Sequence, residues 1–262
     1  MKRIYPIIIV IGALLSMACT TKVSEWVLLN SVPDKYLLVY FHEDELTESV
    51  KQQNSEIENQ FNTANILFKT MRRDEIEKPY YALYFNNRII AEYANKKELL
   101  NIANSPFQEK IADELMTGKL CVMLYLKCGV QERDEKGLQV LRNSVSLSPF
   151  GKAITVMELD RKSAEESQFI SMLLNVESDL KRINEPMLFG IFGKFRALEP
   201  LLAKGISQEN INMMINFFTA DCSCLIKDDL PGSSILFNGK WENPQTALVN
   251  KIIDDNLNLT HH

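Results

Sequence analysis

The residues Tyr-Leu-Leu-Val-Tyr-Phe at positions 36–41 form an unbroken apolar run of strand length. Cys-Val-Met-Leu-Tyr-Leu at 121–126 forms a second such run. A short run that is apolar on both faces is typical of a strand buried in the middle of a sheet. The chain that follows each run has the same order of patterns. The sequence therefore predicts two similar α/β units in tandem.

In the first unit the run at 36–41 precedes a polar stretch with apolar residues at helical spacing, and then a second buried strand. The predicted elements are a helix within 44–61, a strand at 66–68, a hairpin at 80–90 that turns at Asn86-Asn87, and a helix at 96–115 that ends near Gly118. Only a dozen residues separate Phe68 from Tyr80, so we expect no helix between those two strands.

The second unit repeats this order and adds a helix in the middle. The predicted elements are a helix at 134–145, a strand at 154–157, a helix opened by a capping box at 163–166, strands at 187–192 and 195–202, and a helix capped by Ser207. Beyond it, 234–237 reads as a strand, and Asn243-Pro244 as the start of a last helix.

The order strand, helix, strand, optional helix, proline, hairpin, helix resembles the thioredoxin fold over roughly residues 25–224. In that fold a cis proline opens the hairpin strand and faces the active-site loop. The resemblance therefore implies cis bonds at Glu185-Pro186 and Lys78-Pro79. The expected domains are a degenerate unit at 19–117, a second unit at 118–224 and a C-terminal strand–helix extension at 225–262. A single mixed α/β domain with coincidental symmetry is the alternative.

The N-terminus reads as an export signal at residues 1–18. A short basic head, Met-Lys-Arg, precedes an apolar run that ends in small residues before Cys19. Leu-Ser-Met-Ala at 15–18 resembles a bacterial lipobox, although such motifs usually carry leucine where Ser16 stands. The resemblance implies acylation of Cys19 and a stable membrane anchor. Thr20, which is not aspartate, favours the outer membrane, facing the periplasm. Ordinary cleavage near Ala18 without lipid is the alternative.

Composition indicates a globular chain and excludes several classes. The 262 residues are 46% hydrophobic and 24% charged, with a formal net charge of −5 that becomes about −7 once Lys2 and Arg3 are removed. No basic patch suits nucleic acid. The only three histidines are at 42, 261 and 262, which leaves little material for histidine catalysis or a zinc site. Acidic clusters such as 132–135 read as solvated surface. We expect no cofactor.

Four cysteines remain after lipidation: Cys121, Cys128, Cys222 and Cys224. In thioredoxin-like enzymes a Cys-x-x-Cys pair follows the first strand, and the helix N-terminus stabilises the thiolate. Here Cys128-Gly-Val-Gln131 keeps the first cysteine and replaces the second with glutamine. Cys121 and Cys128 lie too far apart along an extended strand to pair. Cys222 and Cys224 are predicted to form a small disulfide ring.

The stretch from Phe189 onward is similar to uncharacterised bacterial envelope proteins that share Cys222-Ser-Cys224, Lys227 and Pro231-Gly232. That similarity implies no activity. We therefore expect a non-enzymatic binding or scaffold module with an envelope protein partner. The alternatives are a thiol-disulfide oxidoreductase that uses Cys128 or Cys222 and Cys224, with Pro186 beside the site, and a copper(I) carrier in which Met213 and Met214 assist the thiolates.

Overall fold

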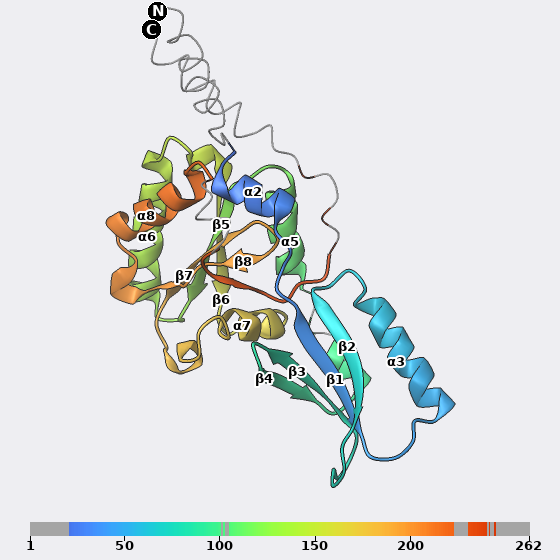
Figure 1. Cartoon of the computed structure of the whole chain (residues 1–262). Coiled ribbons are helices and arrows are strands. Elements are labelled where there is room, and N and C mark those ends of the chain that lie inside the picture. Colours follow the sequence, from blue (N-terminus) through green and yellow to red (C-terminus); the bar gives the residue numbers. More distant parts are fainter. Residues whose placement is uncertain are drawn as a thin grey trace, which may run out of the picture.

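The computed structural model describes residues 21–100, 102, 105–222, 230–239, 241 and 244. Its first half contains one helix that precedes a four-stranded sheet and three helices that accompany it (Figure 1). These elements are α2 (Val23–Asn30), β1 (Tyr36–His42), α3 (Glu48–Gln60), β2 (Ile66–Arg72), β3 (Tyr80–Phe85), β4 (Arg88–Tyr93), α4 (Lys96–Leu100) and α5 (Pro106–Met116).

The second half has the larger sheet and longer helices. Its elements are β5 (Cys121–Lys127), α6 (Gln131–Leu147), η1 (Gly151–Ala153), β6 (Ile154–Asp160), α7 (Ser167–Leu173), η2 (Leu180–Arg182), β7 (Met187–Phe192), β8 (Arg196–Ala197), β9 (Leu201–Leu202), η3 (Ala203–Gly205), α8 (Gln208–Thr219) and β10 (Ser233–Ser234). The prediction of a mixed α/β chain is confirmed.

The two sheets share one pattern of strands. The first has the order β2-β1-β3-β4, in which β1 runs parallel to β2 and antiparallel to β3. The second has the order β10-β8-β7-β5-β6, in which β5 runs parallel to β6 and antiparallel to β7, and β9 also pairs with β7. In each sheet the predicted central apolar run forms an inner strand that pairs with a neighbour on both sides.

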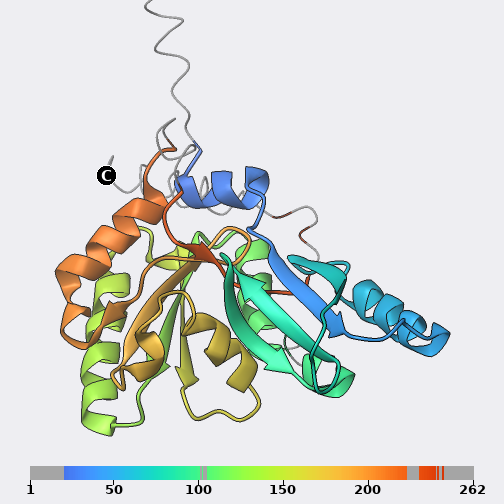
Figure 2. The same cartoon turned by 60° about the horizontal axis from the view of Figure 1, so that its bottom comes forward.

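Helices lie between the sheets and beyond the second one. In one hydrophobic cluster the buried side chains of α3, α5 and α7 pack with one face of each sheet, so both sheets share this core. A second cluster packs α2, α6 and α8 on the other face of the larger sheet. Figure 2 shows α6 and α8 on the side away from the four-stranded sheet.

The chain enters the described region beside the end of α8. Lys22 forms an isolated bridge with Asp221, and its ammonium nitrogen lies 2.8 Å from that carboxylate. In the described part of the chain, no helix is both long and apolar enough to cross a membrane. The predicted signal at residues 1–18 and the predicted lipid site at Cys19 lie outside the described residues.

Turns and caps follow local sequence. Asn86 and Asn87 join β3 to β4 with φ angles of 49° and 60°, the left-handed pair of a type I′ hairpin turn. Ser207 caps α8, and its side-chain oxygen accepts a hydrogen bond from the backbone N–H of Asn210. No helix joins Phe68 to Tyr80. All three predictions are confirmed.

The predicted single helix at 96–115 is wrong, because the chain forms α4 and α5 instead. Pro106 lacks the N–H that a continuous helix needs, and it disfavours helical geometry in the residue before it. Ser105 is accordingly extended, and its side chain accepts from the N–H of Gln108 at 3.0 Å to cap α5. The helix stops before Gly118, as predicted.

The predicted capping box at 163–166 is only half formed. Ser163 accepts from the N–H of Glu166 at 3.4 Å, but the helix begins later, at Ser167. The carboxylate of Glu166 is buried and caps a different helix, α5, where it accepts from the N–H of Phe107 at 2.9 Å and from the hydroxyl of Ser105. A tertiary contact has outcompeted the local pattern.

Two predicted strands are shorter than expected. The strand at 195–202 is broken into β8 and β9, because the chain bulges around Pro200, which has no N–H for the ladder. The strand at 234–237 is reduced to β10, and residues 235–237 continue as irregular backbone inside the core. The helix predicted from Asn243 lies almost wholly outside the described residues.

The predicted cis bonds are also wrong, because the described residues contain no cis peptide bond. Both Glu185-Pro186 and Lys78-Pro79 are therefore trans. The trans form of an X-Pro bond is favoured by about 0.5–1 kcal/mol, so cis persists only where the surroundings require it. Here the carbonyl of Pro186 accepts from the N–H of Ala203 at 3.0 Å, so the trans chain is already bonded to the residue after β9 as it enters β7.

Candidate functional site

Cys128 lies in the short loop that joins β5 to α6, as the sequence predicts. Every residue of β5 before Lys127 is buried, which fixes the strand within the sheet. Gly129 has a φ of 85°, a left-handed conformation that glycine adopts without strain. The loop therefore turns within three residues and leads directly into α6, with Cys128 near the N-terminus of that helix.

Asp134, in the first turns of α6, binds back onto this loop. Its two carboxylate oxygens accept hydrogen bonds from the N–H groups of Cys128 and Gly129, each at 2.9 Å. Asp134 is only 7% exposed, so the interpretation of the 132–135 cluster as solvated surface is wrong for this residue. An acid placed just inside a helix faces its positive end, and this signal could have identified Asp134.

This arrangement opposes thiolate formation at Cys128. Burial raises the pKa of the thiol, and the neighbouring Asp134 carboxylate adds to the rise, whereas the N–H of Val130 and the charge of Arg133 lower it only partly. Reactive cysteines have a lowered pKa because positive charge or free N–H groups stabilise the sulfur anion. The Cys128 loop instead gives two N–H groups to a carboxylate and keeps the thiol protonated at neutral pH.

Pro186 lies at the same end of the second sheet as Cys128. Leu126 pairs with Met187, so Pro186 follows one step beyond that pair, toward the loop. A cavity of about 410 Å³ is lined by Pro186 and the start of α6, and another of about 280 Å³ by Gly129 and Asp134. The thiol of Cys128 lines neither cavity. The sequence thus placed both residues at one sheet end, but the cysteine is enclosed.

The other predicted sulfur ligands do not gather in the described residues. Cys222 is 4% exposed at the end of α8, and its N–H donates to the carbonyl of Thr21 at 2.9 Å. Met214 belongs to the same buried cluster, whereas Met213 is 57% exposed. Cys224 lies outside the described residues, so its bond to Cys222 stays a prediction. Cys121 and Cys128 are both unbonded, in accordance with the expected separation.

The described residues contain a larger cavity that the sequence did not indicate. It has a volume of about 600 Å³ and is lined by one face of α8, the β9 edge and the chain at 231–233. Met213 and Phe217 supply its apolar side, and Glu177 and Glu199 are exposed at its margin. No hydrophobic periodicity in the sequence predicts such a cavity, because its three walls come from segments far apart in the chain.

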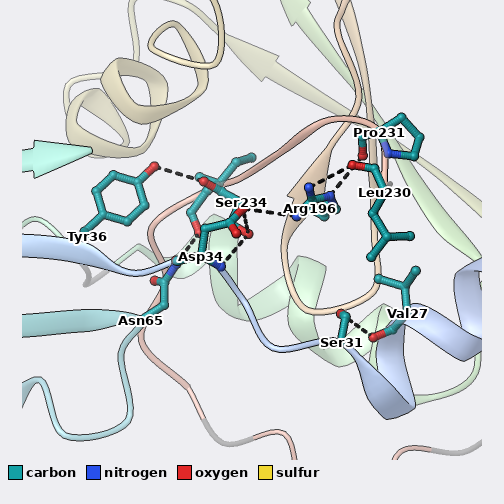
Figure 3. Close-up of polar contacts among 10 residues, drawn as sticks. Val27, Ser31, Asp34, Tyr36, Asn65, Arg196, Leu230, Pro231 and Ser234 are labelled. Carbon is teal, nitrogen blue, oxygen red and sulfur yellow. Dashed lines mark hydrogen bonds and ion pairs between the residues drawn. The ribbon is translucent and has the colours of Figure 1, made fainter. Parts of the chain in front are cut away.

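A polar clasp holds the C-terminal residues 230–238 between the two halves (Figure 3). Arg196 of β8 donates to the carbonyls of Leu230 and Pro231 at 2.9 Å each, and it forms an ion pair with Asp34 at 3.1 Å. The hydroxyl of Ser234 donates to the same Asp34 carboxylate at 3.0 Å. Charged and hydroxyl groups thus fix the start of this strap from both halves.

The first half binds the rest of the strap through Tyr36 and Asn65. The Tyr36 hydroxyl donates to the carbonyl of Ser234 at 3.1 Å, and burial raises the pKa of that hydroxyl well above its usual range. The amide of Asn65 donates to the carbonyl of Ile235 at 3.2 Å and accepts from the N–H of Phe237 at 3.0 Å. These two hydrogen bonds give partners to backbone groups that are otherwise surrounded by apolar side chains.

Sequence reasoning missed the clasp, because none of its polar residues belongs to a motif. Only Ser233-Ser234 ahead of the apolar 235–237 hinted that the segment is buried. No protein-family model matches the chain, and no curated protein matches it.

Proposed function

We propose that this chain is an envelope lipoprotein that acts as a non-enzymatic binding or scaffold module, built from two thioredoxin-like units. The thioredoxin-like assignment is supported by the strand order and directions that both sheets share. The trans bonds at Pro79 and Pro186 count against it, so the assignment rests on topology alone.

The surroundings of Cys128 carry the functional part of the proposal. The only cysteine at a strand-to-helix junction of the described residues is 4% exposed, and its pKa is raised by burial and by Asp134. A thiol–disulfide exchange needs the thiolate as nucleophile. The loop therefore supports a structural role, in which Asp134 ties β5 to α6 and Cys128 fills space.

A pH profile of alkylation tests this conclusion. The exported protein is treated with iodoacetamide between pH 6 and 10, and modification of Cys128 is measured by peptide mass spectrometry, with Cys128 in the urea-unfolded chain as the reference. We expect the folded protein to react more slowly throughout and to reach its half-maximal rate at a higher pH. A plateau reached below pH 7 would assign thiol exchange to Cys128 and refute the proposal.

Thiol exchange through Cys222 and Cys224 is tested in the same samples. Mapping without reductant identifies the pairing, and an insulin-reduction assay on the native protein and Cys222→Ala measures activity. We expect no exchange activity in either protein. Activity that disappears in Cys222→Ala would establish the oxidoreductase instead.

The lipid anchor has its own test. The apolar run at residues 4–18 that ends at Cys19 motivates it. Cells fed labelled palmitate are expected to label the native chain, and Cys19→Ala is expected to lose both the label and the membrane association. Equal labelling and retention of the variant would exclude acylation at Cys19 and leave ordinary cleavage.

A further inference from the structure

Among the described residues, no helix packs on one face of the four-stranded sheet. Because side chains alternate along a strand, the residues in register with Leu37 on β1 share its face. Half-buried or exposed apolar side chains spread over all four strands there: Leu37, Leu67, Met71, Tyr80, Tyr84 and Ile89. We refer to these six residues as the open face.

The second half of the molecule shows what normally lies in this position. α3 follows β1 and packs on one face of its sheet, as α6 follows β5 and packs on the corresponding face of the larger sheet. On the opposite face the larger sheet carries α7, which lies in the chain between β6 and β7. Between β2 and β3 residues 73–79 form no helix, so this connection places no helix on the equivalent face of the first sheet.

The open face is apolar enough to need a cover. Leu67, Met71 and Ile89 are 51%, 49% and 55% exposed. On the same face, the described apolar side chains packed with Val39 and Phe41 are those of the sheet itself and Ile76, and the Arg73 guanidinium lies over the Phe41 ring. A cluster of exposed apolar side chains of this size indicates an interaction site, whereas a single exposed apolar side chain does not.

The dimensions of the open face favour a single helix over a second copy of the chain. Four strands spaced by about 4.8 Å and six residues long at about 3.3 Å each present roughly 20 Å by 20 Å, or about 400 Å². A stable dimer needs about 800 Å² from each partner. A helix of about 13 residues is 20 Å long and 10–12 Å wide, and it covers the centre of such a face.

Charge at the edges of the open face indicates which kind of helix would fit it. The two edges of this face differ in charge: Lys69 and Arg73, whose guanidinium lies 5.6 Å from the ring centre of Phe41, are positive beside β2, and exposed Glu92 is negative on β4. Acidic residues on one side of a bound helix would complement the positive edge.

We propose that the open face docks one amphipathic helix of an envelope protein partner, in the place that α7 occupies on the second sheet. This inference rests on the proposed binding function and names the surface and the kind of partner. The apolar side of the helix, at i, i+3, i+4 and i+7, contacts Leu67, Met71 and Ile89, and an acidic flank lies along Lys69 and Arg73.

A defined helical probe tests the proposal. The probe is a fluorescein-labelled peptide of residues 163–176, because it contains α7, its apolar face and two glutamates near its N-terminus. Fluorescence anisotropy measures its binding to the exported full-length protein in nanodiscs of phosphatidylethanolamine and phosphatidylglycerol. The test variant is Leu67→Glu/Met71→Glu/Ile89→Glu. The matched control, Leu29→Glu/Val32→Glu/Leu147→Glu, adds the same three charges at exposed apolar residues outside the open face.

We expect saturable binding that the test variant weakens at least tenfold and the control changes less than twofold. A peptide carrying Phe169→Ser and Leu173→Ser should also lose at least tenfold. Circular dichroism verifies folding, and Leu67→Glu alone replaces the test variant if that does not fold. No saturable binding, or binding that survives the test variant, overturns the proposal. Self-association of the native protein that the test variant abolishes would assign the face to a second copy and also overturn it.

The two proposals fail separately. If the helical peptide does not bind but Cys128 is alkylated slowly, only the proposed partner of the open face is refuted. If Cys128 is alkylated rapidly below pH 7 but the peptide still binds, only the proposed non-enzymatic role is refuted.

Discussion

Replacement of Asn65 by alanine tests whether the strap at 230–238 holds the two halves together. The Asn65 side chain is the only one in the described residues that bonds both the N–H of Phe237 and the carbonyl of Ile235. Phe237 is 4% exposed and Ile235 is fully buried, so water does not reach either group in the native structure. The third bond, to the carbonyl of Asp34 at 2.9 Å, lies at an exposed residue and is replaceable by water.

The expected loss follows from the two groups that become unpaired. A buried donor or acceptor without a partner costs about 1–3 kcal/mol. A water molecule in the space left by the amide would satisfy part of that demand, so we expect Asn65→Ala to lower the free energy of unfolding by about 2–4 kcal/mol.

Urea unfolding of the chain produced without residues 1–19 measures the loss. Trp241 packs 5.3 Å from Phe237 and 5.7 Å from Phe195 between ring centres, so its fluorescence reports on the strap, and circular dichroism reports on the whole fold. Asn62→Ala is the matched control, because Asn62 is exposed three residues earlier. If the free energies of unfolding of the two variants differ by less than about 0.5 kcal/mol, which is the error of the method, the reasoning is refuted.

Three further predictions concern buried groups. Asp134→Asn removes the negative charge beside Cys128, so the pKa of that thiol should fall and its alkylation at pH 8 should be faster. An unchanged alkylation rate would show that burial alone raises the pKa. Gly190→Ala places a methyl group 2.6 Å from the ring of Phe218, so thermal unfolding should show a loss of about 1–3 kcal/mol, and an unchanged Tm would contradict this packing. Burial raises the pKa of Tyr93 from 10.0 to about 12, and its hydroxyl has no hydrogen-bond partner among the residues that the structure describes. A raised pKa means that the folded state holds the proton more tightly, so this contribution to stability is complete below pH 10 and is lost as the pH rises to 12. Tyr93→Phe should raise the free energy of unfolding by about 1 kcal/mol and reduce the loss of stability between pH 10 and 12. Urea midpoints at pH 9 and 12 measure both effects.

The sequence predicted the elements whose cause is local. The apolar run at 36–41, the Asn86-Asn87 turn and the Ser207 cap each determine their own backbone, and the structure contains all three. Pro106 was an equally local signal, and neglecting it produced the single helix at 96–115. The absence of a helix between β2 and β3 followed from the length of the connection alone.

The candidate sites were harder to predict because their partners lie far apart in the chain. Cys128 was placed correctly at the end of a strand, but its chemistry depends on Asp134, which an acidic cluster concealed. Glu166 caps α5 rather than its own helix, across a separation of 59 residues from Phe107. The open face was implied by the short connection at 73–79, but its apolar surface became visible only through the register of four strands.

The strap has a consequence for the order in which this protein matures. Residues 235–237 supply the side chains that fill the core between the two halves, yet they follow both halves in the chain. During synthesis or export from the N-terminus, each half emerges while this space is still unfilled, and the apolar surfaces around it stay accessible to chaperones. Assembly is therefore completed only when the last segment arrives, and a chain cut short before Leu230 would expose an unfinished interior that proteases recognise.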